Sequence, residues 1–276
     1  MPLLHLFVLA VVQGLTEFLP ISSSGHLVLT WQALGSQAAA HDQVVIDIAV
    51  HVGTLVAVCG YFWRDVATMA GGAWWGLRGR PTAGTRLLLY LVAATLPLIL
   101  AGVALQERIA GHLRDPLVIA WATLLFGLLL YLADRVGLKL RRVDHMRWSD
   151  AVAIGLLQTL ALIPGTSRSG ITMTAGRLLG YERPEAARFS MLLAIPAILG
   201  AGTLAGAEIY ASGNVALGLD ALAAAAMAFV SALLAIALLM RWLQHAGFLP
   251  FVIYRVVLGV VLLWLIYSGR MEAMAL

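Results

Sequence analysis

Hydrophobic residues in this chain gather in runs long enough to cross a lipid bilayer as helices. Six such runs cover about residues 44–63, 86–105, 117–133, 186–207, 215–240 and 249–268. A helix needs roughly 20 predominantly apolar residues to span the hydrocarbon core. Each run therefore predicts one transmembrane helix.

Two further apolar regions, about 2–34 and 149–180, are interrupted near the middle by proline, glycine and hydroxyl residues. Irregular backbone is tolerated at membrane depth only where protein encloses it or where it lines a watery cavity. We interpret each region as a re-entrant helical hairpin, which enters and leaves the membrane on the same side.

The positive charges agree with this threading, because cytoplasmic loops are enriched in Lys and Arg. Thirteen of the 18 basic residues fall on one side, and only Arg108, Arg114 and Arg270 fall on the other. The chain termini are then both extracytoplasmic. The remaining two of the 18 basic residues, Arg168 and Arg255, lie inside apolar segments. Arg255 is close to the predicted cytoplasmic start of the last helix, and we expect its side chain to snorkel to the interface.

Each half of the chain becomes one hairpin followed by three crossings, and since three is odd, the second half is inverted relative to the first. The predicted fold is an all-α polytopic membrane protein with six transmembrane helices and two re-entrant hairpins, built as an inverted-topology repeat. Residues 1–276 form one integral membrane domain, with repeats at 1–133 and 149–268. A weak similarity at an offset of 145 accompanies this pairing: Gln13, Leu15, Ser22, Ser24 and Gly25 match Gln158, Leu160, Ser167, Ser169 and Gly170.

Composition narrows the function classes. Hydrophobic residues make up 61% of the chain and charged residues only 12%. These values exclude a water-soluble enzyme, a nucleic-acid-binding protein and a disordered chain.

The first interruption runs from residue 13 to residue 26 and reads QGLTEFLPISSSGH. Gln13 and Glu17 are four residues apart, so a helix places them on one face. A carboxylate inside the membrane costs about 2.5–3.5 kcal/mol on insertion scales, which favours a functional role for Glu17 and for the nearby His26. The three serines between them either satisfy backbone groups at the break or contact a substrate: Ser22, Ser23 and Ser24.

The second interruption, residues 164–170, reads PGTSRSG. Its glycines let the backbone approach an anion, and Arg168 can hold two phosphate oxygens at once. It lacks the Gly-Lys-Ser/Thr ending of a Walker A loop. The other candidate phosphate-binding residues of this loop are Gly165, Thr166, Ser167, Ser169 and Gly170.

A second polar pair, Asp47 and His51, also lies four residues apart, inside the first long apolar run. We interpret it as a mutually satisfied pair near the extracytoplasmic interface. The alternative is that the pair lines the cavity.

An arginine, a glutamate, a histidine and several serines are the parts needed for phosphoryl transfer. Because the rest of the chain faces lipid, the pattern indicates a phosphorylated substrate with a lipid tail. The competing interpretation is a secondary transporter or lipid flippase, since such proteins also combine inverted repeats with broken helices.

These two segments, together with residues 187–196 (ARFSMLLAIP), resemble the signature motifs of the undecaprenyl-diphosphate phosphatases, also called bacitracin-resistance proteins. The resemblance covers nearly the whole chain. It implies an enzyme of the bacterial plasma (inner) membrane that hydrolyses undecaprenyl diphosphate to undecaprenyl phosphate and phosphate at the extracytoplasmic side. Such an enzyme recycles the lipid carrier for peptidoglycan synthesis, confers bacitracin resistance and requires Mg²⁺ or Ca²⁺.

The resemblance also assigns roles. The family carboxylate falls on Glu17, its serine candidates on Ser22 and Ser23, its histidine on His26 and its phosphate-binding arginine on Arg168. Gln13 stands where a glutamate is frequent. A glutamine can ligate a cation through its carbonyl oxygen but brings no charge, so Glu17 is the main metal ligand and Gln13 the second. The nucleophile is Ser23, with His26 as base, or His26 itself. Whether the chain acts as a monomer or a homodimer is left open.

Overall fold

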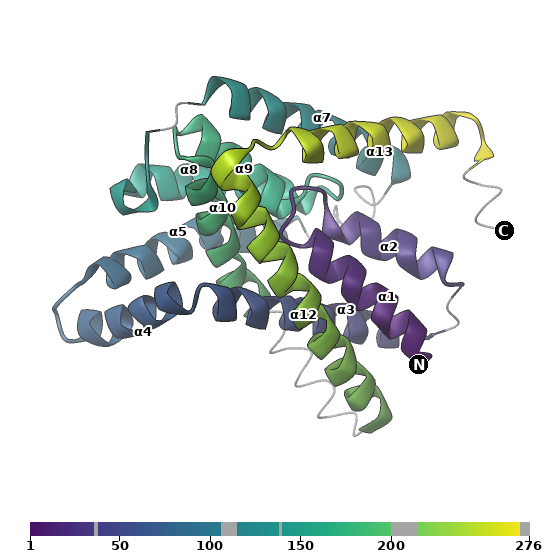
Figure 1. The fold of residues 1–276 in the computed structure, drawn as a ribbon, viewed down its shortest axis with the longest axis horizontal. Helices are drawn as coiled ribbons and strands as arrows, with labels where there is room; N and C mark the ends of the chain where they lie inside the picture. The colour runs from purple at the N-terminus through teal and green to yellow at the C-terminus, as the bar shows by residue number, and fades with distance from the viewer. Residues whose placement is uncertain (36–37, 106–114, 138–139, 200–214, 271–276) are drawn as a thin grey trace. The chain divides into compact units, whose positions relative to one another are not determined.

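The computed structural model describes residues 1–35, 38–105, 115–137, 140–199 and 215–270, and no strand occurs among these residues (Figure 1). The helices are α1 (Leu3–Thr16), α2 (Ser23–Ala33), α3 (Ala40–Tyr61), α4 (Trp63–Leu77), α5 (Ala83–Ala104), α7 (Pro116–Val136), α8 (Trp148–Gln158), α9 (Arg168–Leu178), α10 (Arg183–Leu192), α12 (Val215–His245) and α13 (Leu249–Tyr267), with short 3₁₀ turns at Val143–His145 and Thr159–Leu162.

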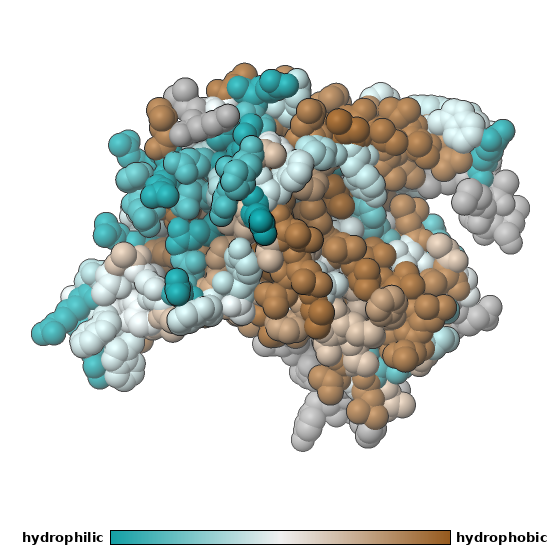
Figure 2. Space-filling model, viewed as in Figure 1, coloured by the Kyte–Doolittle hydropathy of each residue, from teal (hydrophilic) through white to brown (hydrophobic). Residues whose placement is uncertain are grey.

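Five of these helices are long and apolar enough to cross a membrane: α3 from His41 onward, α5, α7, α12 from Ala216 onward, and α13. Apolar side chains remain exposed on their outer faces, and Figure 2 shows hydrophobic surface along the visible side of α13. The chain is therefore an integral membrane protein with a helical, polytopic fold.

The sixth predicted crossing, about 186–207, is described only as far as residue 199. It is helical to Leu192 and again over 194–199, with a turn at Leu193. Pro196 accounts for the break, because proline has no N–H to donate to the carbonyl four residues earlier. The rest of this predicted crossing lies outside the described residues.

Both interrupted regions consist of two short helices separated by a turn. α1 and α8 start 145 residues apart (3 + 145 = 148), as do α2 and α9 (23 + 145 = 168). Ser22 has φ 76° and Ser167 has φ 70°, and these two are the only non-glycine residues with positive φ in the described chain. They too are 145 residues apart (22 + 145 = 167). Since this backbone conformation is uncommon outside glycine, the two breaks share a specific construction.

The described chain forms two compact units, and each takes residues from both sequence halves. Unit 1 comprises Met1–Phe18, His26–Val92 and Met191–Arg241, and unit 2 comprises Leu19–Gly25, Ala93–Ser190 and Trp242–Leu276. The predicted repeats at 1–133 and 149–268 describe a different division and stay a prediction.

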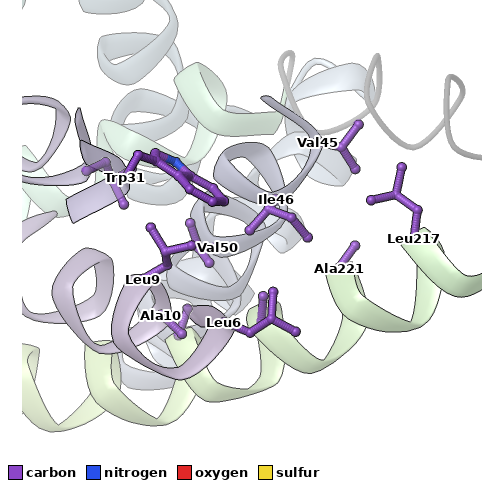
Figure 3. Close-up of a cluster of buried hydrophobic side chains, with 12 residues drawn as sticks. Leu6, Leu9, Ala10, Trp31, Val45, Ile46, Val50, Leu217 and Ala221 are labelled. Atoms are coloured by element: carbon purple, nitrogen blue, oxygen red, sulfur yellow. The ribbon is translucent and has the colours of Figure 1, made fainter. Parts of the chain in front are cut away.

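The core of unit 1 fixes α1 against α3. Figure 3 shows Leu6, Leu9 and Ala10 of α1 in one cluster with Ile46 and Val50 of α3, with Leu9 beside Val50. The spacing of three and four residues puts these side chains on one stripe of each helix. The same stripe of α1 continues to Gln13 and, one turn later, reaches Glu17. The apolar half of α1 therefore sets the position of its polar end. The cluster is completed by Leu27 and Trp31 of α2, Val45 of α3, and Leu217, Ala221, Ala224 and Ala228 of α12.

Glycines bring α12 into close contact with α1 and α3 in this unit. An added Cβ at Gly53 would lie 2.1 Å from the backbone oxygen of Ala225, and one at Gly14 would lie 1.8 Å from Ser231 Oγ. Small residues at such contacts are a common means of helix association in membranes.

We expect Gly53→Ala to lower the free energy of unfolding by about 1–3 kcal/mol, because the new methyl group meets backbone that cannot move aside. Thermal unfolding in detergent measures this. Gly71→Ala in α4 is the matched control, since nothing lies within 4 Å of its added Cβ. The control should be neutral or stabilising by up to about 1 kcal/mol. Equal melting temperatures for the two variants would contradict the close contact.

In unit 2, α13 packs along α7, and α9 lies against α7 and α8 (Figure 1). Asp134 joins the carboxyl-terminal part of α7 to the carboxyl-terminal part of α9 and to the start of α10. Its Oδ1 accepts hydrogen bonds from Arg177 Nε at 3.1 Å and Arg183 Nε at 2.7 Å, and Arg177 is fully buried. Arg177 is therefore a structural residue in α9.

Asp150, at the start of α8, anchors the segment that leads into it. The carboxylate accepts hydrogen bonds from the Arg141 guanidinium, from the Arg147 N–H at 2.9 Å and from Tyr181 Oη at 2.8 Å.

Candidate active site

The candidate carboxylate, Glu17, lies in unit 1, where α1 ends. Gln13 is fully buried, Glu17 is 7% exposed, and Gln13 Nε2 donates a hydrogen bond to Glu17 Oε2 at 2.9 Å. The sequence prediction that these residues share a helical face is confirmed. The amide orients the carboxylate, and Gln13 Oε1 stays buried with no hydrogen-bond partner in the described chain.

His51 of α3 faces Glu17, with 3.6 Å between Nε2 and Oε2. The interpretation of Asp47 and His51 as a mutually satisfied side-chain pair is wrong. The Asp47 carboxylate instead accepts from Trp31 Nε1 at 2.8 Å, and His51 Nδ1 contacts the backbone oxygen of Asp47 at 2.6 Å. The i, i+4 spacing is satisfied through the backbone, which turns the imidazole toward α1.

The serine turn 19–25 belongs to unit 2. Ser22, with its left-handed backbone, is buried, Ser23 is half-buried and Ser24 is exposed. Ser23 is the first residue of α2 and His26 is three residues further, so both lie on one face of that helix, with about 5–6 Å between their Cβ atoms. This arrangement suits a hydroxyl and its base.

The loop before α9 is packed tightly. Gly165 has φ 92°, and an added Cβ would lie 2.4 Å from the backbone oxygen of Ile119 in α7. Ser167 Oγ caps α9 by accepting from the Gly170 N–H at 3.1 Å. Ser169 Oγ donates to the backbone oxygen of Leu19 at 3.0 Å, which joins this loop to the serine turn. Thr166 is fully buried, and its Oγ1 has no hydrogen-bond partner among the described residues.

Arg168 differs from its neighbours in this loop because its side chain is only half-buried. It is the first residue of α9, and its Nη1 lies 3.5 Å from the backbone oxygen of Ser190. The amino end of a helix carries partial positive charge, which adds to the charge of the guanidinium. Among residues 165–170, Arg168 is thus the one that a phosphate can reach most directly.

Arg255 does not snorkel, and that sequence prediction is wrong. Its side chain is fully buried in unit 2, with each of its three nitrogens donating to backbone carbonyls. Nε donates to Thr123 at 3.1 Å, Nη1 to Pro20 at 3.3 Å and to Thr166 at 2.9 Å, and Nη2 to Ala122 at 3.4 Å and to Gly165 at 2.9 Å. A guanidinium has five N–H donors, so all of them are used. Arg255 thereby ties the serine turn and the arginine loop to α7.

The sequence contains a signal for this role. Arg255 lies between Val252 and Gly259 at spacings of three and four, and the buried face of α13 is Val252, Arg255, Gly259 and Leu262. An arginine that shares a helical stripe with a glycine lies on the packed side of the helix. Its burial follows from that stripe and not from its distance to the membrane surface.

A divalent cation of the kind that the family resemblance implies fits the donor set of unit 1. Hard cations prefer carboxylate and carbonyl oxygens. Glu17 would supply the first, and Gln13 Oε1, which is buried and has no hydrogen-bond partner in the described chain, would supply the second. Among the described residues no three His, Cys, Asp or Glu side chains group as a metal site.

The fold and the polar residues at its two breaks define a polytopic membrane protein with a carboxylate at one helix break and a half-buried arginine at the other. The chain belongs to the family described as "Bacitracin resistance protein BacA", whose sequence model matches residues 6–261.

Full-length relatives carry the name undecaprenyl-diphosphatase. The protein of that name from Ruegeria pomeroyi is 50% identical over 271 residues, which cover 97% of this chain and all of the relative. "Undecaprenyl-diphosphatase 1" from Rhodospirillum rubrum is 50% identical over 98% of this chain and 97% of its own length. The relative from Alteromonas mediterranea is 45% identical over 97% of this chain and all of its own length.

Proposed function

We propose that this protein hydrolyses undecaprenyl diphosphate to undecaprenyl phosphate and inorganic phosphate. The single observation that carries the proposal is the full-length identity of about half to undecaprenyl-diphosphatases. The product is the lipid carrier for peptidoglycan synthesis, so the activity recycles that carrier and accounts for bacitracin resistance, the property in the family's name.

In the proposed mechanism Arg168 holds the diphosphate with its guanidinium fork, and the loop hydroxyls Ser167 and Thr166 are the neighbouring donors. Ser23 attacks the terminal phosphorus while His26 takes the serine proton, and the bond to undecaprenyl phosphate breaks as His26 passes that proton to the departing monophosphate. Neutral His26 then takes a proton from a water molecule, which attacks the phosphoserine, releases inorganic phosphate and restores the Ser23 hydroxyl. Half-burial of Ser23 and its helical spacing from His26 support this order over attack by the buried Ser22.

Glu17 and Gln13 would hold the divalent cation, Mg²⁺ or Ca²⁺. A bound cation neutralises charge on the phosphates and on the leaving oxygen. A covalent path of only two residues links Glu17 to Leu19, whose carbonyl accepts from Ser169 of the arginine loop. That Glu17 and Arg168 act on the same diphosphate is what the resemblance to the undecaprenyl-diphosphate phosphatases implies.

The proposed topology has six crossings and two re-entrant hairpins in an inverted repeat, with both termini outside the cytoplasm and the reaction at the extracytoplasmic side. It is supported by the matched helix starts at 3 and 148 and at 23 and 168, and by the matched backbone of Ser22 and Ser167. The bias of 13 basic residues against three supports the orientation.

Phosphate release from farnesyl diphosphate by the purified protein in detergent tests the proposal. We expect multiple-turnover release with Mg²⁺ or Ca²⁺ and none after chelation. A transporter or flippase, which the two broken hairpins would also suit, does no chemistry when no membrane separates two compartments. Absence of release with either cation would reject the phosphatase and leave transport, measurable as flux into sealed vesicles.

A further inference from the structure

The hydrogen bonding of His51 fixes which of its ring nitrogens carries the proton. Nδ1 lies 2.6 Å from the backbone oxygen of Asp47. A carbonyl oxygen only accepts hydrogen bonds, so Nδ1 is the donor. In the neutral ring Nε2 then presents a lone pair, and it presents that lone pair to Glu17 Oε2 at 3.6 Å.

A lone pair that faces a carboxylate oxygen at this distance leaves room for a cation. Two ligands that each lie about 2.1–2.2 Å from one cation are roughly 3.0–3.7 Å apart when the angle at the cation is about 90–115°. The separation of 3.6 Å between Nε2 and Oε2 falls in that range.

The support behind the imidazole is typical of a metal-binding histidine. Such histidines donate their other ring N–H to a carbonyl or carboxylate, which fixes the ring and raises the basicity of the ligand nitrogen. For His51 this acceptor is one turn back on the same helix, and Thr54 Oγ1 donates to the backbone oxygen of His51 at 2.7 Å. α3 is held in turn by the core that Leu6, Leu9 and Val50 share.

We propose that His51 Nε2 is a third ligand in the cation site, beside the Glu17 carboxylate and Gln13 Oε1. The inference rests on the proposed function and specifies its cation site. One imidazole nitrogen and two oxygens form a mixed set, which suits a transition-metal dication such as Mn²⁺ better than Ca²⁺, whose ligands are oxygens.

Electron paramagnetic resonance of Mn²⁺ added to the full-length protein in detergent tests the ligand directly. Electron spin-echo modulation should show ¹⁴N coupling from one imidazole in the wild type. His51→Gln should abolish this coupling and weaken Mn²⁺ binding at least about tenfold. His26→Gln should retain the coupling, because His26 is assigned as a base. His41→Gln, ten residues earlier at the exposed start of α3, is the matched control and should also retain it.

Bound Mn²⁺ without nitrogen coupling, coupling that survives in His51→Gln, or no Mn²⁺ binding at all would each overturn the inference. Should His51→Gln not fold, His51→Asn replaces it, and ¹⁵N-histidine labelling of the wild type shows whether any histidine is a ligand. Phosphate release from the same samples separates the two hypotheses. Release without nitrogen coupling rejects only the His51 ligand, whereas coupling without release rejects only the phosphatase.

Discussion

Arg168→Lys should reduce kcat/KM for phosphate release about 100-fold to 1000-fold while the protein stays folded. The guanidinium presents two parallel N–H donors to two phosphate oxygens, and an ammonium is a point charge that cannot reproduce this fork. A decrease of this size in kcat/KM is typical when an enzyme loses one hydrogen-bond donor that stabilises charge developing in the transition state. Because Arg168 is half-buried and its loop is held by other residues, its replacement should leave the melting temperature nearly unchanged.

Arg188→Lys provides the matched control for this change. Arg188 also lies on a helix, and its Nη1 is 3.4 Å from the Glu185 carboxylate, an ion pair that a lysine can keep. We expect activity close to that of the wild type. If Arg168→Lys turned over as fast as Arg188→Lys, Arg168 would have no part in binding the diphosphate.

Arg255→Met should lower the free energy of unfolding more than Arg168→Lys, Arg188→Lys or Arg135→Met does. The methionine fills part of the volume but donates no hydrogen bond, so five backbone carbonyls lose a charged donor. A buried acceptor without a partner costs about 1–3 kcal/mol, so a total loss of at least about 3 kcal/mol is expected. In a chain of this size that lowers the melting temperature by roughly 6–12 °C.

Activity should also fall in Arg255→Met, since Pro20 and Thr166 belong to the two turns that carry Ser23 and Arg168. Arg135→Met, near the end of α7, removes an exposed arginine by the same chemical change and should be nearly neutral in both measurements. A melting temperature of Arg255→Met equal to that of Arg135→Met would mean that the carbonyl contacts of Arg255 contribute nothing.

Five of the six predicted crossings and the two breaks could be predicted from sequence because bilayer thickness and proline chemistry act locally. A run such as 249–268 needs no knowledge of its neighbours, and α13 covers Leu249–Tyr267. Pro20 and Pro164 mark segments where helices end, and the structure has turns in both. The shared face of Gln13 and Glu17 likewise follows from helical spacing alone.

Long-range partners could not be predicted in this way. Interpreting Arg255 by its depth in the helix missed that its partners are carbonyls up to 235 residues away in sequence, at Pro20. The four-residue spacing of Asp47 and His51 correctly indicated a shared face. It did not reveal that Trp31 takes the Asp47 carboxylate, or that Glu17 lies opposite His51. Such choices depend on which helices pack together, which local patterns do not specify.

A double-mutant cycle on phosphate release tests the central claim, that Glu17 and Arg168 act on the same diphosphate. The wild type, Glu17→Ala, Arg168→Ala and the double variant are compared by kcat/KM with farnesyl diphosphate. Residues that act as a unit show strongly non-additive losses. We predict that each single variant loses at least about 100-fold and that the double variant is little slower than the worse of the two. Wild-type release by Glu17→Ala, or a double loss equal to the product of the single losses, would contradict the account.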